Sequence, residues 1–401
     1  MQLDYPMRQR LIHQIVNRTG KAFEHDDESV RRAIFVAVAE EFSGSRLTVQ
    51  ERKSVVDQLF HAMRGLDVLQ PLMDNPQITE IMVNGPEKVF VEINGCLEPV
   101  DIKFHDREHL AGVITNFFGC ANRLIHEKKP LADMRLASGA RVHAALPPAA
   151  PDGPVLTIRK FTGIRPDIAA LIDSDFLSEE AAEDLVQAVR ERKSIFICGG
   201  TGSGKTTLLN ILSGFIPSQE RVVTIEDAAE LNLQGLDNLV RLEARQPGPD
   251  GDGAIDLTDL VRASLRLRPD RIIVGEVRGR EAYDMLQAMN TGHPGSLCTG
   301  HGNSCQDMID RLALMILLAV QLPWPAVQGM IGSAIDILIH VDRLPTGKRQ
   351  INEICLVQAD AGSGIILEDW YKRHQSGGLV KCKNESYDRN KALQKSSVSP
   401  V

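Results

Sequence analysis

One glycine-rich stretch, placed between an apolar run and a helical pattern, constrains the fold of this chain more than any other feature. The apolar run 194–198 before it is typical of a buried strand, and residues 208–212 after it are typical of the start of a helix. A strand, a G-x4-G-K-T loop and a helix in this order predict a phosphate-binding loop. The stretch reads Gly199, Gly200, Thr201, Gly202, Ser203, Gly204, Lys205, Thr206 and Thr207.

Each residue type in this loop has a chemical reason to be there. Glycines carry no Cβ, so backbone N–H groups can approach phosphate oxygens, and the helix N-terminus adds partial positive charge. We expect residues 199–207 to bind ATP, with Lys205 reaching the β- and γ-phosphates and the Thr206 hydroxyl binding Mg2+. The alternative, a chance glycine-rich turn, is disfavoured by the flanking strand and helix.

The composition limits the other classes of function. The chain has 401 residues, and 43% of them are hydrophobic, so it is long and apolar enough to form two or three domains. Its net charge is −8. Because it is acidic and only 4% aromatic, we expect no nucleic-acid partner. The seven cysteines form no C-x-x-C pair, which is typical of reduced thiols in a cytoplasmic protein. No apolar stretch reaches the roughly 18 residues of a membrane span, so we expect membrane association through partners only.

The hydrophobic periodicity changes along the chain and divides it into parts. Apolar residues recur at helical spacing before residue 66, alternate as in strands up to residue 160, and then follow an alternating strand–helix pattern. The predicted parts are a small helical bundle (1–65), an α+β domain (66–160), a linker (161–175), an α/β domain with a parallel sheet (176–374) and a polar, disordered tail (375–401).

Individual elements follow from the same patterns. In the first part, helices are expected at 8–16, 28–42 and 48–66, with a capping box at Thr48 and Glu51 and a cap at Asp27 or Ser29. In the α+β domain, a helix is expected at 109–125 and strands at 78–83, 88–93, 97–104, 134–136, 137–140, 141–145 and 155–159. In the α/β domain, a helix is expected at 179–190 and strands at 194–198, 221–225, 271–274, 296–299, 336–341 and 350–356.

Two acidic residues end predicted strands that follow the glycine-rich loop. Glu226 follows the run 221–225, and Glu276 follows the run 271–274. Strand ends in an open α/β sheet point toward the ligand. Glu226 is a candidate to orient or deprotonate the attacking water, or to contact Mg2+ through water. Glu276 is a candidate Mg2+ ligand that could also reach the attacking water. The choice of main base stays open, and the alternatives are a helix-capping acid for Glu226 and a solvated strand end for Glu276.

Two histidines bracket the predicted strand 296–299. A histidine at a strand end near a γ-phosphate can sense or stabilise it, so His293 and His301 are both candidate catalytic residues, although a lone histidine is more often structural. Cys298, His301 and Cys305 match no common zinc spacing. We therefore expect no metal other than Mg2+.

Arginines are plentiful near these motifs. A guanidinium on a γ-phosphate stabilises transition-state charge, whereas a single arginine is more often part of a surface ion pair. Arg141 and Arg159 are candidates from the α+β domain. The candidates from the α/β domain are Arg241, Arg245, Arg266, Arg268, Arg278 and Arg280.

Four motifs in this order resemble the secretion-superfamily ATPases of type II and type IV secretion and type IV pili. The motifs similar to theirs are the Walker A motif (199–206), the Asp box (224–231), the Walker B motif (268–279), which carries glutamate in this family, and the His box (291–304). Segments 79–85, 146–148, 153–161 and 240–243 are further similar to the CpaF-like ATPases of tight-adherence (Tad/Flp) pili. Cys298 and Gly300 are local departures inside the His box.

The resemblance implies the fold and the partners. It implies a RecA-like ATPase domain preceded by an α+β (PAS-like) N-terminal domain and a helical bundle. It further implies a homo-hexamer with nucleotide between the two domains of each subunit and with Arg141 and Arg159 as phosphate contacts.

Hydrolysis would then move these domains about the linker and pass work to an inner-membrane platform protein of a pilus or secretion machine. The protein itself would be cytoplasmic and peripheral at the inner membrane. The alternatives left open are the ATPase of a conjugative type IV secretion system, a RecA-like nucleic-acid translocase, and a nucleotide-binding scaffold that does not hydrolyse ATP.

Overall fold

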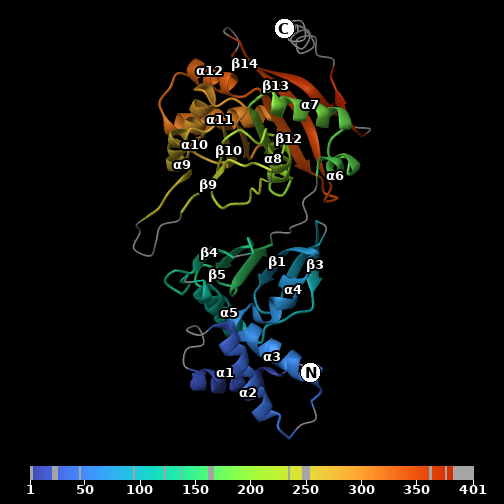
Figure 1. The fold of residues 1–401 in the computed structure, drawn as a ribbon, viewed down its shortest axis with the longest axis vertical. Coiled ribbons are helices and arrows are strands. Elements are labelled where there is room, and N and C mark those ends of the chain that lie inside the picture. The colour runs from blue at the N-terminus through green and yellow to red at the C-terminus, as the bar shows by residue number, and fades with distance from the viewer. Residues whose placement is uncertain are drawn as a thin grey trace. The chain divides into compact units, whose positions relative to one another are not determined.

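The computed structural model of the chain contains two compact units, residues 1–163 and 164–401 (Figure 1). The first unit holds the helical bundle and the antiparallel sheet, and the second holds the glycine-rich loop. The structure describes residues 3–19, 26–44, 47–93, 95–121, 123–136, 138–160, 167–233, 235–245, 253–360, 364–374 and 377–382.

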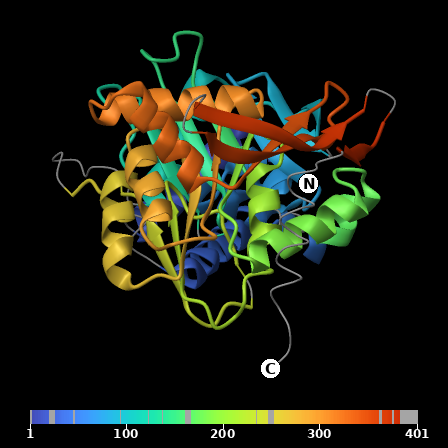
Figure 2. The ribbon, with the colours of Figure 1, turned by 90° about the horizontal axis from the view of Figure 1, so that it is seen from above.

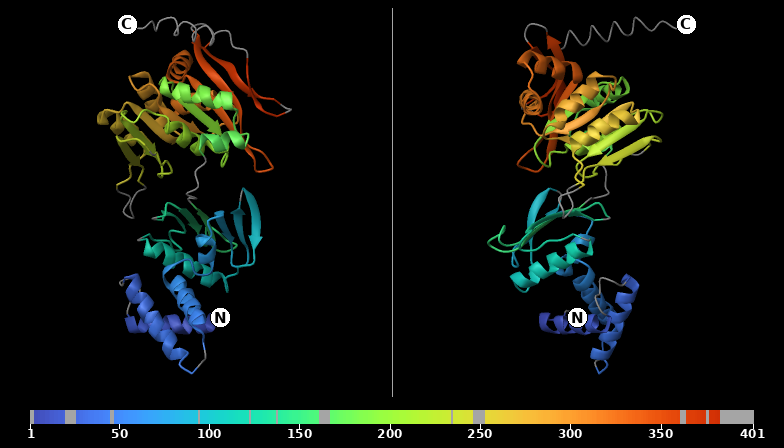
Figure 3. Two further views of the ribbon diagram at one scale, coloured as in Figure 1. Left: turned by 45° about the vertical axis from the view of Figure 1, so that its right-hand side comes forward. Right: turned by 90° about the vertical axis from the view of Figure 1, so that its left-hand side faces the viewer.

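Helices build the N-terminal part of the first unit, as predicted (Figure 3). They are α1 (Tyr5–Thr19), α2 (Asp27–Glu41) and α3 (Val49–Arg64). Their apolar residues recur every three or four positions, so they form one face per helix, and Leu11, Ile34 and Leu59 are fully buried where these faces meet.

The helix caps agree with the sequence in one case and differ in another. Thr48 and Glu51 form the predicted capping box at the start of α3. The cap of α2 is Asp26, whose carboxylate accepts the N–H of Ser29 at 2.9 Å. The expected cap at Asp27 or Ser29 is therefore wrong by one position, because Asp27 already lies in the first turn.

An antiparallel sheet with the strand order β3-β2-β1-β6-β5-β4 completes the first unit. Helix α5 (Arg107–Cys120) covers one face, where alternate residues such as Ile81, Val142 and Ile158 are buried. A short 3-10 helix η2 (Asp67–Leu69) and α4 (Gln70–Asp74) lead into β1. The strands are β1 (Ile78–Asn84), β2 (Val89–Ile93), β3 (Cys96–Val100), β4 (Leu131–Arg135), β5 (Arg141–Ala145) and β6 (Val155–Arg159).

Some predicted elements of this unit need correction. The predicted strand 137–140 is wrong, because residues 138–140 belong to the turn between β4 and β5, and Ala137 lies outside the described residues. Strand β3 ends at Val100 and α5 ends at Cys120, both earlier than expected. The residues 137–140 read Ala-Ser-Gly-Ala, and the serine and glycine among them favour a turn over a strand.

The sheet of the second unit has the strand order β15-β14-β13-β12-β7-β11-β10-β8-β9. Strands β12, β7, β11, β10, β8 and β9 are parallel, and β13 to β15 extend the sheet antiparallel. The strands are β7 (Ile195–Gly199), β8 (Val222–Glu226), β9 (Leu239–Glu243), β10 (Arg271–Val277), β11 (Leu297–Gly300), β12 (Ile337–Arg343), β13 (Arg349–Asp360), β14 (Gly364–Arg373) and β15 (Leu379–Lys381).

Helices cover both faces of this sheet (Figure 2). One face carries α6 (Ile168–Asp173), α7 (Glu179–Arg190) and α8 (Lys205–Ser213), and the other carries α9 (Leu257–Ser264), α10 (Glu281–Asn290), α11 (Cys305–Ala319) and α12 (Trp324–Ala334), with a 3-10 turn η3 (Leu265–Leu267) after α9. Because β7 is covered on both sides, it reads as a continuous apolar run. No helix among the described residues is long and apolar enough to cross a bilayer.

The second unit also corrects three expectations. The sheet is mixed rather than wholly parallel, because β13 to β15 run antiparallel. Helix α6 lies inside the stretch expected to be linker, of which 161–166 fall outside the described residues. Strand β15 lies inside the expected disordered tail, where Leu379 is buried and Lys381 contacts Asp184 at 2.6 Å. A three-residue strand is too short to give a periodic signal.

A buried ionic cluster ties α1 to the sheet part of the first unit. Arg8 of α1 lies 2.5 Å from Asp67 of η2, and the other Asp67 oxygen lies 2.7 Å from Nε2 of His109 on α5. All three residues are less than a tenth exposed. Nη2 of Arg8 also lies 3.0 Å from Nε2 of His109, and Nδ1 of His109 accepts the N–H of His105 at 3.2 Å.

We therefore expect Arg8→Ala to destabilise the first unit by about 3–5 kcal/mol, because it leaves a buried carboxylate without its cation. The matched control is Arg18→Ala on the same helix, whose pair with Glu40 is about half exposed and should contribute about 0–1 kcal/mol. Urea unfolding with hydrogen exchange on α1 and α5 measures both changes. Equal losses of unfolding free energy in Arg8→Ala and Arg18→Ala would contradict the stabilising role given to the buried Arg8–Asp67 pair.

Candidate functional site

The glycine-rich loop joins the central strand β7 to α8. Gly202 and Gly204 have φ angles of +70° and +104°, a region that glycine adopts without strain. Gly204 is the N-cap residue of α8 and offers no side-chain cap. The first N–H groups of α8 therefore face the loop without a capping side chain, which suits an anion.

The side chains of the loop fit a phosphate group. Lys205 is 7% exposed, and its Nζ donates to the carbonyls of Gly199 at 3.0 Å and Gly200 at 2.7 Å. The Ser203 hydroxyl is buried, and among the described residues it has no hydrogen-bond partner. Thr206 lies in the first turn of α8. A buried ammonium, an unsatisfied hydroxyl and helix N–H groups without a capping side chain at one loop are the donors that a nucleotide phosphate needs.

Three predicted residues lie at the carboxyl ends of adjacent parallel strands. Glu226 ends β8, Glu276 lies near the end of β10, and His301 follows β11 directly. Oε1 of Glu276 lies 2.6 Å from Nε2 of His301, a distance of close contact whose angles are not those of an aligned hydrogen bond. The structure therefore brings Glu276 and His301 together beside the strand that carries the loop.

The two glutamates have different surroundings. Glu226 is 3% exposed, and its Oε1 accepts the N–H groups of Glu230 at 2.7 Å and Leu231 at 2.8 Å. One carboxylate oxygen of Glu226 is thus hydrogen-bonded to the backbone of the segment that follows β8. The Glu276 side chain is 21% exposed, and Nε of Arg278 donates to its Oε2 at 2.9 Å. Arg278 is the predicted arginine that the structure brings to a candidate catalytic carboxylate.

The charge around His301 links it to the loop. Burial and then the Lys205 ammonium lower the pKa of His301 below its ordinary value, and the Glu276 carboxylate opposes them. The lowered pKa favours a neutral ring at neutral pH. Lys205, His301 and Glu276 therefore form one electrostatic group at the carboxyl edge of the sheet.

The other histidine lies at the opposite edge. His293 precedes β11, and its Nδ1 lies 3.1 Å from the carbonyl oxygen of Ala288. Because β11 is parallel to β7, its amino end is remote from the loop at the carboxyl end of β7. The structure does not bring His293 to the glycine-rich loop. Two residues on either side of one strand lie at opposite edges of the sheet, so His293 and His301 cannot both lie at the edge of the loop.

Arg141 and Arg159 lie in the first unit as register partners on β5 and β6. They alternate with the buried Val142 and Ile158, so they face away from α5. Nε of Arg159 lies 3.2 Å from Glu80. Their contact with nucleotide remains a prediction.

Two arginines that the sequence did not single out stand beside the loop. A Cβ built on Gly202 would lie 3.2 Å from Nη1 of Arg343, and one built on Gly204 would lie 3.6 Å from Cδ of Arg349. These arginines end β12 and begin β13, and they reach the loop because β12 pairs with β7. No local motif marks them, and only the strand order reveals them.

The loop leaves no room for a side chain at its first position. A Cβ on Gly199 would lie 2.1 Å from the carbonyl oxygen of Val341, whereas a Cβ on Gly200 would meet nothing within 4 Å. We expect Gly199→Ala to lower the free energy of unfolding by about 1–3 kcal/mol through overpacking. Gly200→Ala, the matched control, should leave it nearly unchanged in thermal unfolding without nucleotide. An unchanged free energy of unfolding in Gly199→Ala would contradict this prediction, because it would show that β12 can move away from the added methyl group without cost.

The titration of His301 tests the electrostatic group. The pKa of His301 should lie below the ordinary value, should fall further in Glu276→Gln, which removes an anion, and should rise in Lys205→Met, which removes a cation. Nuclear magnetic resonance of labelled histidine rings measures both shifts. The ring signal of His293 is the internal reference because it lies at the other edge of the sheet. Shifts of the same sign in both variants would contradict this arrangement.

Known proteins are similar to this chain in sequence and in fold. The family model of the type II/IV secretion system protein matches residues 62–398. A putative conjugal transfer protein of Mycobacterium tuberculosis is 34% identical over 77% of this chain and 89% of its own length. The type IV secretion system protein VirB11 of Brucella suis is 34% identical over 69% of this chain and 84% of its own length.

A solved structure supports the same architecture. The Legionella pneumophila ATPase DotB has a TM-score of 0.51 and 21% identity, over 78% of this chain and 82% of its own, which shows a shared fold. Together with the family match over most of the sequence, the glycine-rich loop and the strand-end glutamates give one conclusion: this chain belongs to the type II/IV secretion system protein family, the superfamily of secretion ATPases.

Proposed function

We propose that this chain hydrolyses ATP to ADP and phosphate with Mg2+ and couples the reaction to domain motion. The observation that carries the proposal is the group formed by Lys205, His301 and Glu276 at the carboxyl edge, next to uncapped helix N–H groups. A loop that only bound phosphate would not require a carboxylate and an imidazole in contact beside it.

The residues take the following roles in this proposal. Residues 199–207 hold the phosphates, and Lys205 neutralises charge on the β- and γ-phosphates. Thr206 and Glu276 would hold Mg2+, which supplies charge neutralisation when bound. Glu226 orients the water that attacks the γ-phosphate in line, because its loop contacts fix one oxygen and set the direction of the other. Arg278 holds Glu276 in position.

We further infer that the active form is a homo-hexamer that powers a Tad/Flp-like pilus or protein secretion at the inner membrane, acting from the cytoplasm. In this form Arg141 and Arg159 of the first unit contact the nucleotide phosphates, and hydrolysis changes the position of one unit against the other. An inner-membrane platform protein receives the motion. The similarity of segments such as 79–85 and 240–243 to CpaF-like ATPases supports this choice.

The second candidate is the ATPase of a conjugative type IV secretion system. The names of two relatives, a putative conjugal transfer protein and VirB11, favour it. A RecA-like nucleic-acid translocase is disfavoured by the net charge of −8. Stimulation of hydrolysis by single-stranded DNA, measured against an equal concentration of heparin, separates a translocase from the other two.

The experiment that tests the function compares the wild-type chain with Glu276→Gln. We expect the variant to bind ATP and assemble as the wild type does, while its turnover falls by at least about 100-fold. The measurements are steady-state phosphate release and mass analysis by light scattering, with and without ATP and Mg2+. Glu368→Gln on β14 makes the same chemical change far from the loop and should keep wild-type turnover. Equal, negligible turnover in wild type and Glu276→Gln would overturn an autonomous ATPase.

A further inference from the structure

The hairpin between β12 and β13 places two arginines directly opposite each other beside the glycine-rich loop. Arg343 ends β12 and Arg349 begins β13, and the two are register partners in this antiparallel pair. Two backbone hydrogen bonds close the turn between them, since Leu344 donates its N–H to the carbonyl of Lys348 and Gly347 donates its N–H to that of Leu344, both at 2.8 Å. The hairpin therefore fixes the backbone from which both arginines extend.

This hairpin concentrates positive charge. Residues 343–349 include three cations and no acidic residue. Nζ of Lys348, the cation between the two arginines in sequence, pairs with Asp175 at 2.8 Å. Like charges directly opposite each other destabilise an antiparallel pair of strands. An arginine pair at this position is therefore unfavourable for folding alone, and an anion bound by both arginines offsets the repulsion.

The two arginine side chains reach the loop at the glycines on either side of Ser203. A Cβ built on Gly202 would lie 3.2 Å from Nη1 of Arg343. One built on Gly204 would lie 3.6 Å from Cδ of Arg349. Between these glycines the Ser203 hydroxyl is buried and has no hydrogen-bond partner in the described part of the chain. Because the glycines carry no side chain, both arginines can approach the backbone whose N–H groups suit a phosphate.

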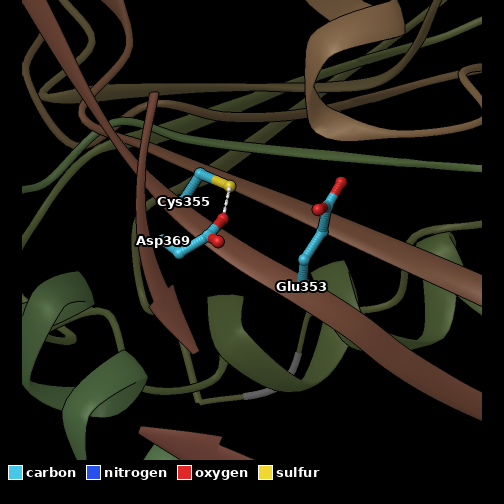
Figure 4. Close-up of side chains that lie close together, drawn as sticks. All are labelled: Glu353, Cys355 and Asp369. Carbon is cyan, nitrogen blue, oxygen red and sulfur yellow. Dashed lines mark hydrogen bonds between the residues drawn. The ribbon is translucent and has the colours of Figure 1, made fainter. Parts of the chain in front are cut away.

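The strand that carries Arg349 is anchored at a distance from the loop. Further along β13, the Glu353 carboxylate accepts the N–H of Cys305 on α11 at 2.7 Å. Sγ of Cys355 donates to Oδ1 of Asp369 on β14 at 3.7 Å (Figure 4). Strand β12 is in turn paired with β7, which leads into the loop. The arginine pair therefore extends from fixed strands, as a precise ligand contact requires.

We propose that Arg343 and Arg349 form a clamp that binds the phosphate tail of a nucleoside di- or triphosphate held by the loop of the same chain. A guanidinium forms bidentate, charge-assisted hydrogen bonds with phosphate oxygens. The clamp rests on the proposed function, because it requires a nucleotide beside Lys205. It is distinct from the predicted contacts of Arg141 and Arg159, because both arginines of the clamp belong to the unit that carries the loop.

The affinity of the full-length chain for two phosphate probes tests the clamp. Competition against a fluorescent ATP analogue, with Mg2+ present, gives the Kd for ATP and for inorganic tripolyphosphate. Arg343→Ala and Arg349→Ala should each raise both Kd values by roughly 10- to 100-fold, since each removes hydrogen bonds between charged groups. The two probes should be affected alike, because the clamp contacts only the phosphates.

The salt dependence of binding separates a phosphate contact from mere support of the loop. Loss of a contacting cation should make the Kd for ATP less dependent on salt, whereas a variant that only distorts the loop should keep the wild-type dependence. Arg343→Lys should keep that dependence and recover part of the affinity, because lysine keeps the charge without the planar fork. Lys348→Ala is the matched control, since it removes one charge from the same hairpin and should keep the Kd close to wild type.

The outcomes distinguish failure of the clamp from failure of the proposed function. The clamp is overturned if wild type binds ATP and Lys205→Ala abolishes binding, while either Arg343→Ala or Arg349→Ala binds ATP as wild type does. It is also overturned by a loss of affinity for ATP without a loss for tripolyphosphate, which would place the arginines at the base or the sugar. A folded wild-type chain that binds neither probe overturns the proposed function together with the clamp.

Discussion

The structure of the second unit depends on the close approach of two backbones at Gly199. The carbonyl of Val341 occupies the space where a side chain at this position would lie. Strand β12 can therefore pair with β7 up to the first residue of the loop. That pairing sets the path of the loop, and it also brings the ends of β12 and β13, with Arg343 and Arg349, beside the loop glycines. A hydrogen atom in place of a methyl group thus decides which residues surround the phosphate site.

The amino and carboxyl edges of the parallel sheet differ in how their polar groups are paired. At the amino edge, Arg271 is fully buried, pairs with Glu220 at 2.6 Å and donates to the carbonyl of Val189 at 2.7 Å. A buried pair with its hydrogen bonds complete closes that edge and fixes the start of β10. At the carboxyl edge the polar groups are instead Lys205, whose charge lowers the pKa of His301, and Glu276, which contacts the His301 ring. His293 belongs to the closed edge, which explains why the two histidines differ.

Two buried thiols lie close in sequence to the residues of the nucleotide site. Cys198 directly precedes Gly199, and Cys305 follows His301 by four residues. A change in the packing of these thiols is therefore one residue away from the loop backbone on β7, and one short segment away from the ring that contacts Glu276. Rigid elements of this kind transmit small displacements because a packed core does not deform continuously.

The sequence by itself determined the glycine-rich loop, its strand and helix, and the grouping of Glu226, Glu276 and His301. Each of these follows from a local motif together with the rule that parallel strands present their carboxyl ends at one edge. Only the tertiary structure decided that His293 lies at the other edge, that Arg343 and Arg349 flank the loop, and that β15 completes the sheet. It also decided that Cys198, Cys305 and Cys355 lie in one buried core cluster. These contacts join residues far apart in the chain through the order of the strands, and local periodicity carries no information about that order.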